Sequence, residues 1–145
     1  MKTSIKLFLL ALTTISLASC SKSNDDNPSN SSTNKTDQVT GNWTVTYYYD
    51  SGKDETSDYN GYSFAFNSGD VLQAVNGSST YTGTWRIGDN SSDDDSSSNK
   101  LVISITGNKY MDDLQDDWLI VKITDTEIWL QDDNPASAEE LRFGR

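Results

Sequence analysis

The stretch 62–87 reads YSFAFNSGDVLQAVNGSSTYTGTWRI and decides the fold. Its large apolar residues alternate with small or polar ones, as in Tyr62, Phe64 and Phe66. This period of two is typical of β-strands that bury one face. Short turn sequences separate the strand-like runs, and Asn76-Gly77 is the strongest hairpin signal in the chain. The stretch therefore predicts three consecutive antiparallel strands.

The same alternation continues on both sides of this stretch. Expected strands cover 43–48, 62–66, 71–75, 81–87, 101–105, 118–123, 127–130 and 140–143. One helical turn is expected in Lys109–Asp116, and the polar stretch Gly88–Asn99 has the composition of a hairpin insertion. Eight short strands in sequence predict an all-β fold, an antiparallel up-and-down meander barrel. The alternative is a two-sheet β-sandwich, which would need long crossover connections.

The first residues have the features of a targeting segment. Lys2 and Lys6 precede an apolar run that is shorter than the roughly 20 residues of a transmembrane helix. The sequence Leu-Ala-Ser-Cys ending at Cys20 resembles the lipobox of bacterial lipoproteins. That resemblance implies that residues 1–19 are a lipoprotein signal peptide and that the new N-terminal Cys20 is acylated. The chain would then be attached to a membrane through this lipid anchor.

Residues 20–40 are expected to form the lipidated Cys and a disordered tether, because Val39 is the only apolar residue between Ser21 and Thr40. The acidic Asp25-Asp26 soon after the Cys resembles the export signal of Bacteroidota surface lipoproteins. A merely solvated linker is the alternative reading of this segment. Residues 41–145 are then one domain, which is long enough to bury a single core.

The composition excludes several classes of function. The chain of 145 residues has a net charge of −11, no histidine and a single cysteine. Without histidine, neither Ser-His-Asp nor Cys-His nucleophiles nor histidine-based metal sites can form. The excess of acidic residues repels phosphate backbones, so we expect no nucleic-acid partner.

Gly41-Asn42-Trp43 opens the first expected strand, and Arg142 lies in the last one. This G-x-W pattern resembles that of the lipocalins and the wider calycin group. The order of G-N-W and four later motifs resembles that of small lipocalin-like domains on Bacteroidota lipoproteins. These motifs are G-Y-x-F-x-F (61–66), G-T-W (83–85), D-W (117–118) and L-x-F (141–143). The resemblance implies an eight-stranded lipocalin-like barrel whose closed end has Trp43 covered by Arg142, and a cation over an indole ring is a favourable pair.

Aromatic side chains are the candidate binding residues. The alternation places six of them on the inward face, where they would either pack the barrel or line a cavity for an apolar ligand or a sugar. These candidate ligand-binding residues are Tyr47, Tyr62, Phe64, Phe66, Trp85 and Trp118. Tyr48, Tyr49 and Trp129 are expected on the outer face, where exposed rings could stack on sugars or contact a partner.

Acidic pairs recur along the chain, as in Asp112-Asp113, Asp132-Asp133 and Glu139-Glu140. Oxygen-rich loops suit Ca²⁺, but these pairs lack the spacing of a calcium loop with its turn glycine. We therefore expect solvated surface charge, with no metal, no cofactor and no catalytic residues. Lys122 is surrounded by apolar residues in its strand and is expected to point outward.

These observations together predict a lipid-anchored envelope protein of the outer membrane, which could be exposed at the cell surface. The expected protein is a monomer and not an enzyme. Its barrel is expected to bind a small apolar or amphipathic ligand. The alternative is a surface interaction or glycan-binding module with a packed barrel.

Overall fold

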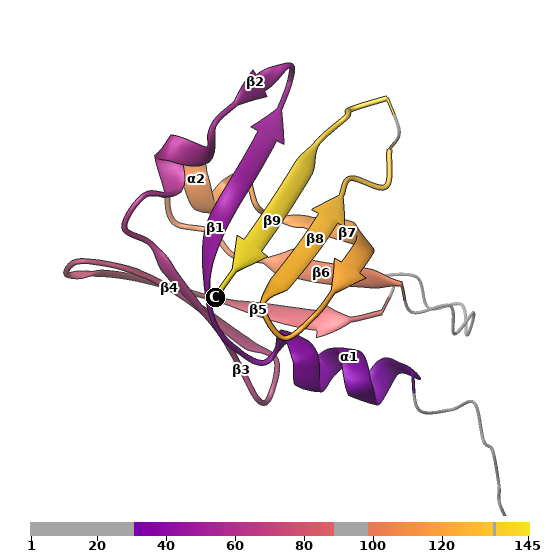
Figure 1. The fold of residues 1–145 in the computed structure, drawn as a ribbon. Helices are drawn as coiled ribbons and strands as arrows, with labels where there is room; N and C mark the ends of the chain where they lie inside the picture. Colours follow the sequence, from indigo (N-terminus) through magenta and orange to yellow (C-terminus); the bar gives the residue numbers. More distant parts are fainter. Residues whose placement is uncertain (1–30, 89–98, 135) are drawn as a thin grey trace, which may run out of the picture.

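The computed structural model describes residues 31–88, 99–134 and 136–145 (Figure 1). The expected signal peptide, Cys20 and residues 89–98 of the acidic insertion lie outside the described residues. The helical elements are α1 (Ser31–Val39), the 3₁₀ helix η2 (Thr56–Tyr59) and α2 (Lys109–Asp112). The strands are β1 (Gly41–Asp50), β2 (Lys53–Asp54), β3 (Ser63–Asn67), β4 (Val71–Asn76), β5 (Ser79–Ile87), β6 (Lys100–Ser104), β7 (Asp116–Ile123), β8 (Glu127–Gln131) and β9 (Glu140–Gly144).

Eight of these strands close into a barrel. From β3 to β9 each strand pairs antiparallel with the next, β1 pairs with β3, and β9 returns to pair with β1 (Figure 1). The short β2 only adds two residues to the end of β1. This confirms the predicted all-β, eight-stranded antiparallel meander barrel. The sandwich alternative is not formed, because all these strands belong to one sheet, which the pairing of β1 with β9 closes.

The tight turns lie where the sequence signals placed them. Gly69 and Asp70 join β3 to β4 with φ values of 75° and 63°, and Gly77 joins β4 to β5 with φ 59°. Glycine and aspartate tolerate this left-handed region better than most residues do. The resulting register sets Phe66 opposite Leu72, so that both side chains point into the core.

Aromatic rings occupy the interior of the barrel. Phe143 meets Phe64 and Phe66 at ring centroid distances of 5.5 Å, with interplanar angles of 71° and 85°. Phe66 meets Trp85 in the same edge-to-face manner, also at 5.5 Å. Aromatic pairs prefer this geometry, which adds to the stabilisation from burial. Side chains therefore fill the part of the barrel in which these rings meet.

Helix α1 changes the predicted domain boundary. Residues 20–40 were expected to be disordered, but Ser31–Val39 form a helix and Val39 is fully buried in the core. The carbonyl oxygen of Val39 accepts a hydrogen bond from Trp43 Nε1 at 2.7 Å. A mostly polar segment is helical here because its single apolar side chain packs on the barrel, a tertiary contact that periodicity does not reveal.

The expected helical turn in 109–116 is confirmed as the shorter helix α2. Asn108 caps it, since its side-chain oxygen accepts a hydrogen bond from the Met111 backbone N–H at 3.0 Å. Met111 and Leu114 are fully buried, so this segment covers one end of the barrel. Helix α1 lies at the opposite end (Figure 1).

Candidate functional site

Five of the six candidate ligand-binding residues belong to the packed core. Phe64, Phe66, Trp85 and Trp118 are at most 2% exposed and Tyr62 is 8% exposed. Both indoles are fixed by hydrogen bonds, because Trp85 Nε1 donates to the Asn67 carbonyl and Trp118 Nε1 donates to the Leu114 carbonyl. Their inward orientation is as predicted, and their neighbours in the structure are other core side chains.

Tyr47 lies outside the barrel, contrary to the prediction. The pairing of β1 with β9 shifts by one residue between Val45 and Tyr47, which is a β-bulge. A bulge reverses the alternation that follows it. Tyr48, predicted on the outer face, is therefore fully buried, while Tyr47 and Tyr49 are only half-buried on the outer face.

The arginine over Trp43 is Arg145 and not Arg142, so that prediction is wrong. The Arg145 guanidinium carbon lies 4.1 Å from the centroid of the Trp43 ring, and Arg145 Nη1 donates to the Thr40 carbonyl at 3.2 Å. Arg142 lies between the buried Leu141 and Phe143 in β9 and points outward. An outward side chain in mid-strand cannot reach an indole inside the end of the barrel.

Arg142 instead belongs to a cluster on the outside of β1, β9 and β8. We call this cluster the outer aromatic surface and define it as Tyr47, Tyr49, Trp129 and Arg142. The strand register places Tyr47 beside Arg142 and Arg142 beside Trp129. The Arg142 guanidinium carbon lies 4.2 Å from the Trp129 ring centroid and 5.3 Å from that of Tyr47.

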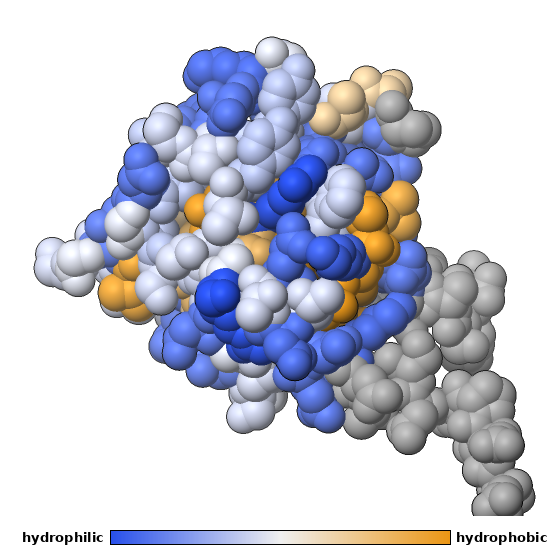
Figure 2. Space-filling view, viewed as in Figure 1, coloured by the Kyte–Doolittle hydropathy of each residue, from blue (hydrophilic) through white to orange (hydrophobic). Residues whose placement is uncertain are grey.

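The two tyrosines of this surface are nearly coplanar. Tyr47 and Tyr49 lie two residues apart on β1, with ring centroids 6.4 Å apart and an interplanar angle of 7°. Two ion pairs flank the rings, Arg142 with Glu140 and Lys122 with Glu127. Lys122 lies opposite Trp129 on β7 and points outward, as predicted. Figure 2 shows the face formed by β1, β9 and β8, on which blue and near-white residues dominate and apolar atoms show toward β7.

A surface hollow of about 540 Å³ adjoins the outer aromatic surface. The register places Tyr49 opposite Glu140, which lines the hollow. The other lining residues come from β7, from the end of β8 and from the β8–β9 connection: Leu119, Gln131, Asp132, Asp133, Asn134, Ala138 and Glu139. A second hollow, of about 560 Å³, lies over β5, β6 and β7. Trp85 is the one aromatic residue among those that line it, and Trp85 is only 2% exposed.

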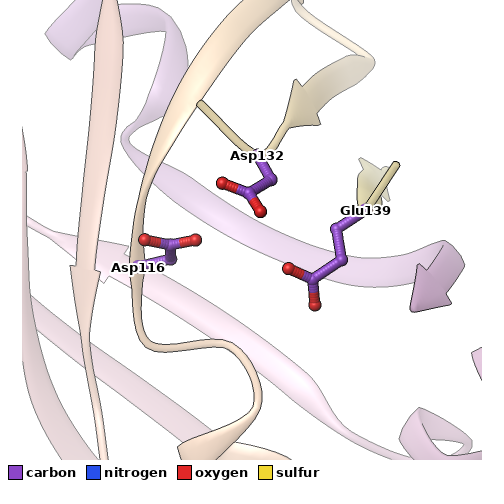
Figure 3. Close-up of side chains that lie close together, drawn as sticks. All are labelled: Asp116, Asp132 and Glu139. Atoms are coloured by element: carbon purple, nitrogen blue, oxygen red, sulfur yellow. The ribbon is translucent and has the colours of Figure 1, made fainter. Parts of the chain in front are cut away.

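Three carboxylates converge beside the first hollow. Asp132 and Glu139 line that hollow, and Asp116 lines the second hollow. Oxygen atoms of Asp116, Asp132 and Glu139 lie within 4.8 Å of one another (Figure 3). Burial, and then the charge of Asp50, raises the pKa of Glu139 to about 7, and burial also raises the pKa of Asp116. Such a group of carboxylate oxygens could hold a divalent cation. Without a cation, protonation of Glu139 would relieve the repulsion among the three negative charges.

The sequence showed these carboxylates as separate acidic pairs without revealing that they meet. The barrel brings the start of β7 beside the β8–β9 connection, and only the three-dimensional pairing of β7 with β8 does so. The outer aromatic surface was missed in part for a similar reason. Trp129 and Tyr49 were expected on the outer face. The β-bulge that turns Tyr47 to the same face could not be seen in the alternation of the sequence.

No helix among the described residues is long and apolar enough to cross a membrane. No family model and no curated protein matches this chain. A solved structure that is similar to it is a DUF4847 family protein from Bacteroides vulgatus. The two share 13% sequence identity with a TM-score of 0.49, and the match covers 72% of this chain and 92% of that protein.

Proposed function

We propose that this protein is a lipid-anchored binding module that holds glycans on its outer aromatic surface and catalyses no reaction. The observation that carries the proposal is the row Tyr47, Arg142 and Trp129 on adjacent strands, with Tyr49 parallel to Tyr47. A sugar ring presents apolar C–H faces and a rim of hydroxyl groups. Flat aromatic rings beside hydrogen-bonding side chains match both features.

The packing of the core favours this surface over the barrel interior. Of the six residues expected to line a cavity, five pack against other core side chains and Tyr47 points outside. Ring-to-ring contacts at 5.5 Å occupy the space where an apolar ligand would lie. The outer surface, by contrast, is only half-buried, and its Tyr49 lies opposite Glu140, which lines the hollow.

The groups that flank the surface also favour an uncharged ligand. Glu140, Asp132, Asp133 and Glu139 line the hollow, so an anionic polymer would meet like charge there. Glu140 and Gln131 supply acceptor oxygens, and the Gln131 amide also supplies donors. This chemistry suits sugar hydroxyls and disfavours nucleic acids.

We place the protein at the outer membrane as a monomer, attached through an acylated Cys20. This part of the proposal rests on the lipobox-like sequence. The position of α1 supports it, since the chain enters the barrel at the end opposite α2 and the β8–β9 connection (Figure 1). A tether that leaves from α1 would hold the hollow away from the lipid surface.

The binding proposal is tested with Tyr49→Ala in the full chain, purified in detergent and applied to an array of neutral and acidic glycans. We expect the natural protein to be retained by neutral glycans and the variant to lose at least about tenfold in retention. Val75→Ala, an apolar residue 37% exposed on β4, is the matched control and should bind normally. Absence of retention of the natural protein by any glycan would refute the proposal.

The anchor is tested separately with Cys20→Ala. We expect this variant to leave the membrane fraction, whereas Ser21→Ala should remain in it. Membrane association of Cys20→Ala equal to that of the natural protein would refute the lipid anchor and leave the glycan proposal intact.

A further inference from the structure

The four tryptophans of the barrel differ in what their indole nitrogens contact. Trp43 Nε1 donates to the Val39 carbonyl at 2.7 Å, Trp85 Nε1 to Asn67 at 2.9 Å, and Trp118 Nε1 to Leu114 at 3.0 Å. These three rings are at most 2% exposed and are fixed parts of the core. Trp129, on the outer face of β8, is only half-buried.

Trp129 Nε1 is nevertheless buried and finds no hydrogen-bond acceptor among the described residues. An indole N–H can only donate, so no other contact compensates for its loss of water. Buried donors without a partner are rare in folded proteins and destabilise the state in which they occur. Such a donor on a candidate binding surface suggests that its acceptor comes from outside the chain.

The side chain of Arg142 lies over the face of the Trp129 ring. Its guanidinium carbon lies 4.2 Å from the centre of the indole ring, and its Nε donates to Glu140 Oε1. The Arg142 side chain is 35% exposed, so solvent reaches it in its present position. Long arginine side chains on a surface exchange among rotamers easily, and partly exposed ion pairs hold them weakly.

The strands beneath are rigid by comparison. Trp129 and Arg142 are directly paired across β8 and β9, and their neighbours Leu130 and Leu141 are fully buried. Movement of the guanidinium would therefore uncover the indole without any change in the barrel. Glu140 also lines the adjoining hollow, so it could keep Arg142 as a partner after such a movement.

We propose that Trp129 is the principal sugar-binding residue of this protein and that Arg142 is its removable cover. On binding, the guanidinium leaves the indole face and a neutral pyranose ring stacks in its place. A hydroxyl oxygen of the glycan that extends past the edge of the indole accepts the hydrogen bond of Nε1, which points in the plane of the ring. This inference rests on the proposed glycan-binding function and names the residue and the ligand class that would carry it. No covalent step is involved.

Two consequences distinguish this role from a structural one. Trp129→Phe keeps an aromatic ring and removes the unpartnered donor, so it should weaken binding without lowering stability. Arg142→Ala removes the cover, so it should strengthen binding. If Arg142 were itself the main ligand contact, its removal would weaken binding instead.

The experiment uses the full chain in detergent and affinity electrophoresis through gels with dextran, galactomannan or xyloglucan, and through gels with polygalacturonate as an acidic probe. We expect retardation by a neutral polysaccharide and none by polygalacturonate. Trp129→Phe should lose at least about tenfold in affinity with an unchanged or higher urea midpoint. Arg142→Ala should gain about twofold to tenfold in affinity. Val75→Ala, on β4 and outside this surface, is the control and should bind normally.

Intrinsic fluorescence gives a second measurement of binding, which starts from the natural protein. Because the other three indoles are buried and hydrogen-bonded in the core, a sugar that stacks on Trp129 should shift the emission through that residue. Loss of the shift in Trp129→Phe supports the inference. Normal binding by Trp129→Phe, or weaker binding by Arg142→Ala, overturns it. If Tyr49→Ala loses binding while Trp129→Phe does not, the proposed function stands and this inference fails. If the natural protein binds no polysaccharide, both fail.

Discussion

Two arginines only three residues apart, Arg142 and Arg145, lie in different surroundings. Arg145 covers Trp43 at 4.1 Å and donates to the carbonyls of Thr40 and Gln38. It thereby connects the end of β9 to the residues that join α1 to β1. Arg142 lies on the outer face, where solvent screens its pair with Glu140.

We predict that Arg145→Ala lowers the free energy of unfolding by about 1–3 kcal/mol, the sum expected for a cation–π pair and charge-assisted hydrogen bonds. Arg142→Ala should cost less than about 1 kcal/mol. Urea unfolding followed by tryptophan fluorescence measures both. A larger loss of unfolding free energy in Arg142→Ala than in Arg145→Ala would contradict the assignment of Arg145 as the cation that stabilises Trp43.

A second prediction at this scale concerns Glu139. Burial and the nearby Asp50 raise its pKa to about 7 from an ordinary value of 4.5. The folded protein thus favours the protonated carboxyl. The stability that this provides is complete below about pH 4.5 and is lost as the pH rises through about 7.

Glu139→Gln keeps the side chain neutral at every pH, so the variant should be more stable than the natural protein at pH 8 and about equal to it at pH 4.5. Urea midpoints at the two pH values measure the difference. Glu140→Gln is the control, because it removes the partner of Arg142 and should not stabilise the protein at pH 8. A gain in Glu139→Gln that is the same at both pH values would contradict the titration of Glu139.

Among the elements, the strands and turns could be predicted from the sequence because each is decided locally. The alternation in β3 and the Asn76-Gly77 turn need no distant partner. The β-bulge in β1 could not be predicted, since it is set by pairing with β9, about a hundred residues away. The bulge exchanges the faces on which Tyr47 and Tyr48 lie, so Tyr47 joins the candidate site on the outside.

Helix α1 escaped prediction for the same reason. Its composition is that of a linker, and tertiary contacts, such as the hydrogen bond from Trp43 to the Val39 carbonyl, make it part of the domain. The convergence of Asp116, Asp132 and Glu139 likewise depends on closure of the barrel. Local geometry can be predicted from this sequence, whereas contacts between distant segments cannot.

The burial of Val39 leads to a prediction for α1 as an element. Val39→Ala removes two methyl groups from a fully buried position beside Trp43, and we expect a loss of about 1–2 kcal/mol in the free energy of unfolding. Gln38→Ala, in the same helix, should be close to neutral because its contact to Arg145 uses the backbone carbonyl. Equal effects of the two substitutions in urea unfolding would show that α1 does not depend on Val39.

Over the whole molecule, the barrel separates two tasks. The interior provides stability through packed rings, while the half-buried residues on the outside of β1, β8 and β9 remain available for contact. Helix α1 lies at one end of the barrel and the β8–β9 connection lies at the other (Figure 1). Residues of that connection line the hollow. This arrangement suits a scaffold that holds a binding surface away from its point of attachment.

The last prediction tests whether the interior is a scaffold or a container. Phe143 packs against both Phe64 and Phe66, so Phe143→Ala should cost about 3–5 kcal/mol and leave a cavity lined by rings. An apolar fluorescent dye such as 1-naphthylphenylamine should bind poorly to the natural protein and should raise the melting temperature of Phe143→Ala, because a ligand that binds only the folded state stabilises it. Tyr49→Ala, on the outside, should leave dye binding unchanged. Tight stoichiometric dye binding by the natural protein would instead show that the barrel opens to take an apolar ligand, and the binding function would then belong to the interior.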